Sequence, residues 1–163
     1  MQSPHSNFSN LGVEHMMPTS QHWQFDQRVA NDLDVGHAAI EDLMNALSMC
    51  GWEGADLFRI QMAVEEAVVN AIEHGNKRDP SKLVHIVFQV TPEKVTMMIQ
   101  DEGEGFDHRN VADPTEDELV DKPRGRGVML MRELMSEAIY NEAGNQVTMV
   151  KVRSKAESDP IES

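Results

Sequence analysis

The stretch from Glu66 to Asn76 (EAVVNAIEHGN) most constrains this chain, because it places a carboxylate and an amide on a helix that is otherwise largely apolar. Apolar residues recur at helical spacing over residues 57–71, and no proline interrupts them. The pattern predicts a helix from about 53 to 74, which Gly75 would end.

Glu66, Asn70 and Glu73 lie at i, i+4 and i+7 and therefore share one face of this helix. Their neighbours are valines and an isoleucine, and a helix that is apolar nearly all round is usually buried. Burying a carboxylate and an amide is costly unless they have partners. These side chains therefore either meet other polar groups inside the fold or line a ligand site. Glu65 points about 100° away around the helix, which makes it the weaker candidate for a base.

The composition bounds the kinds of partner and site. A net charge of -14 over 163 residues argues against nucleic acid as a partner, since phosphate binding needs clustered Lys and Arg. Cys50 is the only cysteine, and the seven histidines lack metal-binding spacing. Neither a secretory leader nor a run of about 20 apolar residues is present, so we expect a cytoplasmic protein without membrane contact.

The chain divides into a central domain and two tails. Residues 1–22 are rich in Ser, Asn, His, Met and Pro without periodicity, which predicts a disordered tail, with a partner-binding arm as the alternative. Residues 23–155 carry the regular patterns and form one domain. Residues 156–163 form an acidic tail.

Strands and helices follow one another in the order β-α-α-β-β-loop-α-β-β. Asn31 or Asp34 is expected to cap the first helix, which ends near Gly51. The last helix begins near Pro123. Since the strands fall mostly in hairpin pairs, we expect an α+β two-layer sandwich, with a mixed, mostly antiparallel sheet and helices on one face. The strands are predicted at 23–29, 83–90, 94–100, 138–140 and 146–153.

A glycine-containing acidic segment, Asp101-Glu-Gly103-Glu-Gly105-Phe106, follows the first predicted hairpin. Glycine permits backbone conformations and close approaches that are barred to other residues. A buried carboxylate at a strand end can accept a proton from the amino group of a base. Taken alone, the segment is equally typical of an acidic turn.

A second glycine pair, Gly125-Arg126-Gly127, opens the last predicted helix. The exposed N–H groups and the dipole of a helix N-terminus attract anions, and glycine lets a phosphate reach the backbone. Lys122 and Arg124 add positive charge to an otherwise acidic protein. The alternative is a flexible loop that closes with a glycine cap.

Asn70 and Glu66 complete the set. An amide oxygen can hold Mg²⁺, and a carboxylate one turn earlier can accept a hydroxyl proton; the alternative is a buried pair that satisfies itself. Together the three motifs describe an ATP site without a P-loop. The acidic segment 108–122 lies between the last two motifs, and we expect it to be a lid that the γ-phosphate orders.

The three motifs resemble the N, G1 and G2 boxes of the gyrase, histidine-kinase and MutL ATPase superfamily. The ending NAIEHGN and the helix GRGVMLMRELM are most similar to the RsbW / SpoIIAB branch, bacterial anti-sigma factors that are also serine/threonine-protein kinases. The resemblance covers about 23–153 and implies a Bergerat-type ATP-binding fold.

The resemblance also implies roles for individual residues. Glu66 would be the general base, Asn70 the Mg²⁺ ligand, and Asp101 the reader of the adenine amino group. Gly103 and Gly105 would shape the floor of the pocket. The phosphates would be cradled by Gly125, Arg126, Gly127 and Val128, and further nucleotide contacts would come from His74, Phe106, Lys122, Arg124 and Asn145.

Two positions depart from the family pattern. Asn145 stands where the family often has threonine, in the sequence Gly-Asn-Gln-Val, so a hydrogen bond is kept but the affinity can differ. The lid arginine that contacts phosphate has no certain counterpart; Arg124 is the first candidate and Lys122 the second.

The resemblance implies an ATP- and Mg²⁺-dependent kinase that phosphorylates a STAS-domain antagonist and sequesters a sigma factor, as a homodimer. The alternative from another class is a module that binds ATP or ADP only to change conformation, although such a binder does not need Glu66. The ATP-binding part of a sensor histidine kinase is a third alternative, which a single helix before the N box disfavours.

Overall fold

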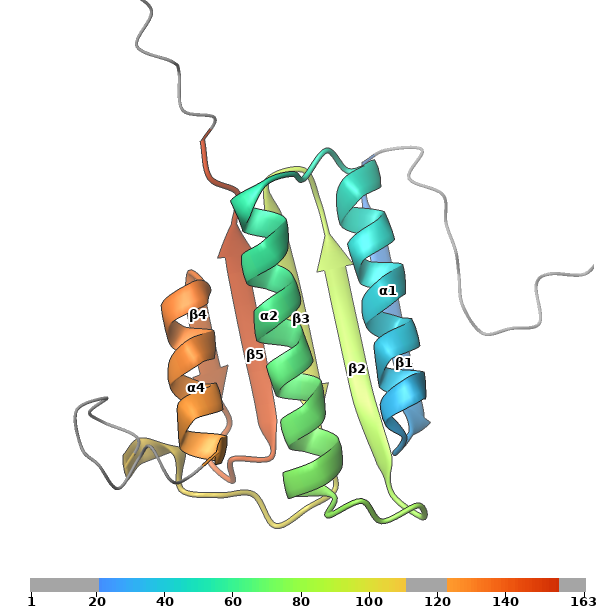
Figure 1. Cartoon of the computed structure of the whole chain (residues 1–163), viewed down its shortest axis with the longest axis vertical. Helices are drawn as coiled ribbons and strands as arrows, with labels where there is room; N and C mark the ends of the chain where they lie inside the picture. Colours follow the sequence, from blue (N-terminus) through green and yellow to red (C-terminus); the bar gives the residue numbers. More distant parts are fainter. Residues whose placement is uncertain (1–20, 111–122, 156–163) are drawn as a thin grey trace, which may run out of the picture.

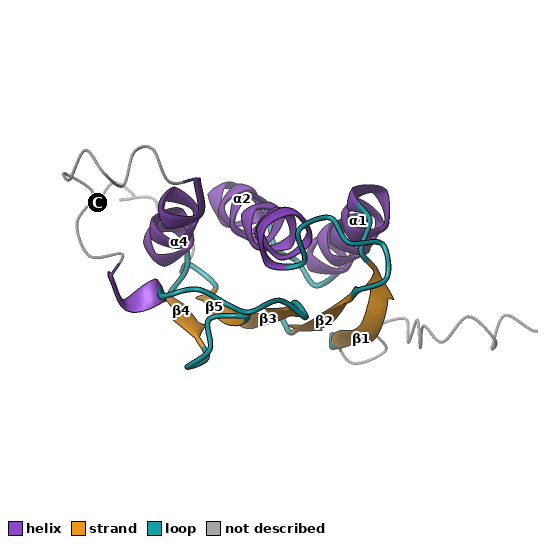
Figure 2. Ribbon diagram, turned by 90° about the horizontal axis from the view of Figure 1, so that it is seen from below, coloured by secondary structure: helices purple, strands orange, loops and turns teal. Residues whose placement is uncertain are grey.

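The computed structural model describes residues 21–110 and 123–155, and these form a sheet with helices on one face, as Figure 2 shows. The α+β two-layer sandwich that the sequence predicted is thereby confirmed. No helix in the described ranges combines the length and the apolar character that a membrane span needs. In chain order the elements are β1 (Trp23–Ala30), α1 (Leu33–Met49), α2 (Ala55–Val69), β2 (Leu83–Val90), β3 (Lys94–Gln100), α4 (Pro123–Leu134), β4 (Glu137–Tyr140) and β5 (Gln146–Val152).

The sheet has the strand order β1-β2-β3-β5-β4 (Figure 1), and each of its four pairings is antiparallel. Both predicted hairpins form, β2 with β3 and β4 with β5. Side chains alternate along each strand, so that every second residue of β2, from Val84 to Val90, is buried under the helices. The other face of the sheet carries polar residues such as Gln89 and Thr96, which stand opposite each other.

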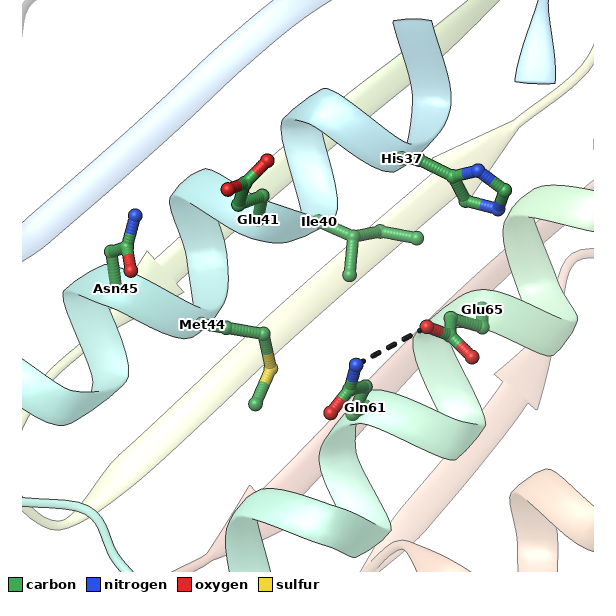
Figure 3. Close-up of a pocket in the computed structure, with 7 residues that line it drawn as sticks. All are labelled: His37, Ile40, Glu41, Met44, Asn45, Gln61 and Glu65. Atoms are coloured by element: carbon green, nitrogen blue, oxygen red, sulfur yellow. Dashed lines mark hydrogen bonds between the residues drawn. The ribbon is translucent and has the colours of Figure 1, made fainter. Parts of the chain in front are cut away.

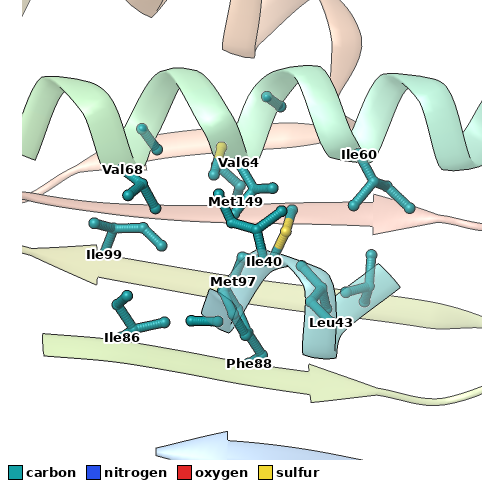
Figure 4. Close-up of a cluster of buried hydrophobic side chains, with 14 of the residues drawn as sticks. Ile40, Leu43, Ile60, Val64, Val68, Ile86, Phe88, Met97, Ile99 and Met149 are labelled. Atoms are coloured by element: carbon teal, nitrogen blue, oxygen red, sulfur yellow. The ribbon is translucent and has the colours of Figure 1, made fainter. Parts of the chain in front are cut away.

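The core lies between the helix layer and the sheet (Figure 4). Ile60, Val64 and Val68 repeat every four residues along α2 and are fully buried against the strands. Phe88 of β2 and Met97 of β3 are paired across the sheet and are fully buried as well. The apolar repeat over residues 57–71 therefore marks the face of α2 that builds the core.

The start of α1 corrects one prediction. Asp32, rather than Asn31 or Asp34, caps the helix, and its carboxylate accepts hydrogen bonds from the N–H groups of Asp34 (2.9 Å) and Val35 (3.1 Å). Asn31 is already engaged elsewhere, since its amide donates to the carbonyl of Asp79 (3.0 Å).

The end of the central helix also differs from the prediction of one helix through residue 74. The α-helix ends at Val69, and Asn70–Gly75 continue as a wider π-helical segment. Such segments are rare and often occur at functional sites, because the widening turns side chains away from their α-helical directions. The predicted tails (residues 1–20 and 156–163) and residues 111–122 of the predicted lid lie outside the described residues, so these predictions and the domain boundaries stay predictions.

Candidate functional site

Three segments that are far apart in the sequence meet at one end of the sandwich, the lower end in Figure 1. They are the π-helical segment after α2, the segment that follows β3, and the start of α4. These are the three motifs that the sequence singled out, and their glycines pack against side chains of neighbouring segments. We call this end of the molecule the motif end.

One close approach joins the start of α4 to α2. A Cβ atom added to Gly127 would overlap the Glu66 carboxylate and would lie 2.7 Å from Nδ2 of Asn70. Only glycine lets the α4 backbone come this close to both side chains. Glu66, Asn70 and a helix N-terminus, predicted separately from sequence, are therefore brought into contact.

Glu66 of α2 and Asn70 of the π-helical segment are both in unusual environments. Burial raises the pKa of Glu66 above its usual value, and the charges of His74 and Arg126 oppose that rise only in part. Asn70 is 5% exposed, and its Nδ2 has no hydrogen-bond partner among the residues that the structure describes. A buried amide nitrogen without a partner is costly, which is the mark of a functional rather than a structural position.

Asp101 lies at the end of β3 and is 4% exposed. Its Oδ1 accepts a hydrogen bond from the N–H of Gly103 (2.8 Å), and its own N–H donates to the carbonyl of Asn145 (2.9 Å). Its carboxylate packs against Gly75, where any Cβ would overlap it. Within the acidic segment, Asp101 is thus a buried carboxylate that packs on the end of the central helix, whereas Glu102 and Glu104 are exposed.

The segment after Asp101 is wedged against the β4–β5 turn. Gly105 and Gly144 have φ angles of 78° and 80°, and a Cβ on either one would overlap the backbone of the other segment. Phe106 contacts Tyr140 edge to face, with ring centroids 5.1 Å apart. Asn145 lies in this turn, and its side-chain oxygen accepts a hydrogen bond from the side-chain amide of Asn141 (2.7 Å).

The remaining predicted site residues differ in how exposed they are. His74 and Arg126 are exposed at the motif end, while Gly125 is buried. The Val128 side chain is fully buried in the core, so only its backbone N–H could face a phosphate. Lys122 and the side chain of Arg124 lie outside the described residues.

Sequence reasoning missed Asn76, which is 0% exposed and whose amide hydrogen-bonds three other segments. The only local signal is a polar residue directly after the glycine that ends the helix. Its partners lie up to 45 residues away, so that no spacing rule could reveal them.

A separate groove of about 300 Å³ runs between α1 and α2 on the outer side of the helix layer (Figure 3). Ile40 and Met44 line it from α1, and Gln61 donates a hydrogen bond to Glu65 (3.3 Å) on its α2 side. Glu65 therefore faces this groove and not Gly127, as its position on the helix predicted.

A family model and several known proteins are similar to this chain. A family model described as the histidine kinase-like ATPase domain matches residues 29–151. Serine-protein kinase RsbW of Staphylococcus aureus is 31% identical over an alignment of 121 residues, and the match covers 69% of this chain and 76% of that protein. RsbW of Staphylococcus epidermidis is 29% identical over the same shares of the two chains.

One solved structure shares the fold. The RsbU and RsbW domains of Rv1364c from Mycobacterium tuberculosis match 80% of this chain, with a TM-score of 0.55 and 19% identity. The present chain spans 31% of that longer protein. At this identity the likeness concerns the fold alone.

Proposed function

The chain belongs to the histidine kinase-like ATPase family and, within it, to the RsbW family, and on this premise we propose that it is an ATP-dependent protein-serine/threonine kinase. It would transfer the γ-phosphate of ATP to a hydroxyl of a STAS-domain antagonist protein. It would also bind and sequester a sigma factor. Phosphorylation of the antagonist would then decide which of the two partners is bound.

The observation that carries this proposal is the contact of Gly127 with Glu66 and Asn70. Phosphates bound at the start of α4 would lie beside a half-buried carboxylate whose pKa is raised by burial. As the hydroxyl oxygen bonds to the γ-phosphorus, its proton would pass to Glu66, and the bond to the bridging oxygen would break to release ADP. Such a transfer depends mainly on positioning and charge, which this arrangement supplies.

Asp101 is proposed to accept a hydrogen bond from the adenine amino group. It is buried and ionisable, and its Oδ1 accepts a hydrogen bond from the N–H of Gly103, which orients the carboxylate. Gly103, Gly105 and Phe106 would form the wall around the base, with the amide nitrogen of Asn145 at its edge. His74, Arg126 and, from the residues without a described side chain, Lys122 and Arg124 would face the phosphates.

Mg²⁺ fits the residues at the motif end. An amide oxygen on Asn70 is a hard ligand of the kind that Mg²⁺ prefers, and the unpartnered Nδ2 of the same amide shows that this side chain is not consumed by the fold. Among the described residues no group of three His, Cys, Asp or Glu could hold a metal alone, which suits an ion held mostly by phosphate and water. Bound there, Mg²⁺ would neutralise charge on the phosphates.

Incubation with γ-labelled ATP tests the proposal, with and without STAS-domain proteins from the same organism. We expect acid-stable label on a serine or threonine of one antagonist, and loss of sigma-factor binding when the unphosphorylated antagonist is present. Label that stays only with bound nucleotide, while partner binding still depends on ATP or ADP, would favour the binding module instead. Gel filtration would show whether the active form is the expected homodimer.

A further inference from the structure

Asn76 is a fully buried polar side chain at the motif end, and both atoms of its amide group are hydrogen-bonded. Its Nδ2 donates to the carbonyl of Leu83 (2.9 Å) and to the side-chain oxygen of Asn31 (3.1 Å). Its Oδ1 accepts a hydrogen bond from the N–H of Glu102 (2.7 Å). With 0% exposure, this amide has exchanged all of its water contacts for contacts with the protein.

These bonds form a closed ring of three residues. Asn76 donates to the carbonyl of Leu83, the N–H of Leu83 donates to the carboxylate of Glu102, and the N–H of Glu102 donates to Asn76. The ring joins the end of the π-helical segment, the start of β2 and the turn after β3. Its members are 7 and 26 residues from Asn76, so that it fixes the relative positions of separate elements.

The partners require an amide at this position. The N–H of Glu102 needs an acceptor, while Leu83 and Asn31 each present an oxygen that needs a donor. An aspartate would offer acceptors only and would face two oxygens, and an alanine would remove the partner of all three groups.

The ring lies next to the buried carboxylate. Glu102 directly follows Asp101, and Gly75 directly precedes Asn76. The carboxylate of Asp101 packs on Gly75, and a Cβ on Gly103 would overlap the Gly75 carbonyl. Residues 75–76 and 101–103 are therefore in contact along their length, and a shift of Asn76 displaces Asp101.

We infer that Asn76 is a positioning residue, which holds Asp101 at the place where it distinguishes adenine from other bases. This inference rests on the proposed function, because it needs a nucleotide at Asp101. A carboxylate accepts a hydrogen bond from the amino group at C6 of adenine, whereas guanine presents a carbonyl oxygen there. The consequence of a displaced Asp101 is therefore a lower ratio of ADP to GDP affinity.

Titration of the full chain with ADP and GDP tests the inference in four variants. N76D is expected to weaken ADP about tenfold and to lower the ADP/GDP affinity ratio, as does D101N. N31A removes one acceptor from Asn76 and is expected to lower the ratio about two- to threefold. D56N is the matched control, because Asp56 is equally buried and hydrogen-bonded at the opposite end of the sheet; it should leave the ratio unchanged.

The ratio separates positioning from mere stability, since a partly unfolded sample loses affinity for both nucleotides equally. If D101N lowers the ratio and N76D does not, the role of Asn76 is overturned while the proposed role of Asp101 stands. If D101N leaves the ratio unchanged, the proposed adenine contact fails, and the inference fails with it. Should N76D not fold, N31A decides: an unchanged ratio overturns the inference.

Discussion

The two ends of the sandwich both bury polar side chains, but they treat them differently. At the opposite end from the site, where α2 begins and β5 ends, Asp56 accepts hydrogen bonds from the N–H and the hydroxyl of Ser154, each 2.8 Å long. The indole N–H of Trp52 donates to the carbonyl of Thr91 (2.7 Å) nearby. At the motif end, Asn70 has an amide nitrogen without a described partner, and burial raises the pKa of Glu66.

The glycines at the two ends also differ, in the space that surrounds their Cβ positions. At the motif end Gly75, Gly103 and Gly127 lie against carboxylates, an amide or a carbonyl, with no room for a Cβ. Gly54, at the opposite end, has nothing within 4 Å of its Cβ position. Both ends thus use polar groups to hold elements together, as Asp56 and Asn76 do, but only the motif end combines them with close-packed glycines and with a buried amide nitrogen, on Asn70, that has no partner among the described residues. The predictions that follow test this division, in order of decreasing effect on activity.

Glu66→Gln should produce the largest change. The amide cannot take up the hydroxyl proton, so that phosphoryl transfer should fall by about 10²–10⁴-fold, while ADP binds as before. Single-turnover transfer and ADP titration measure the two effects. A variant that transfers phosphate at the wild-type rate would remove Glu66 from the role of base.

The pH profile of transfer provides a second test of Glu66. Burial raises its pKa above the ordinary 4.5, although the charges of His74 and Arg126 act against this shift. The base form is lost as the pH falls through the raised pKa, so the wild-type rate should decline on the acid side at a pH above 4.5. The decline should be absent from the residual activity of Glu66→Gln.

Gly127→Ala should come next, because its new methyl group would overlap Glu66 and crowd Asn70. A displacement of about 1 Å at a reacting centre can cost about 10²-fold in rate, and we expect a loss of this order. Gly54→Ala is the matched control: its φ of 66° and ψ of −141° make alanine strained by about 1–3 kcal/mol, yet transfer should not change. Equal losses of activity in both variants would argue against a special role for Gly127.

Asp101→Asn should weaken ATP and ADP alike, since the adenine contact is common to both. A hydrogen bond to a charged group contributes about 1.5–3 kcal/mol, which corresponds to a loss of roughly 10- to 100-fold. Calorimetric titration measures both affinities. An unchanged affinity for ADP would contradict the assignment.

Asp56→Asn should leave nucleotide affinity unchanged and lower only stability, by about 1–3 kcal/mol at pH 7. Burial alone would raise the pKa of Asp56, but the two hydrogen bonds from Ser154 and the charges of Lys151 and Arg59 outweigh it, so the pKa lies below its ordinary 3.8. The stabilisation is complete above pH 3.8 and is lost as the pH falls through the lower, folded-state pKa. Denaturant unfolding of both proteins should show the difference shrinking below that pH; a constant difference would contradict the linkage.

Periodicity and local chemistry were enough to predict most of the fold. The apolar repeat of α2 and the alternation in β2 and β3 lie within single elements, where spacing alone determines which side chains share a face. The same rule put Glu66 and Asn70 on one face and turned Glu65 away. The three motifs, read together, also indicated the family before any contact was known.

The sequence by itself determined which residues belong to each element and which of them carry unusual polarity. Only the tertiary structure decided how these residues meet: that Gly127 touches Glu66, that Asp32 rather than Asn31 caps α1, and that the side-chain oxygen of Asn145 bonds to Asn141. The structure also shows the ring of hydrogen bonds around Asn76, which the spacing of residues in the sequence does not predict. The physical reason is that periodicity reports on neighbours along one helix or strand, whereas these contacts arise only when packing of the core brings separate elements together.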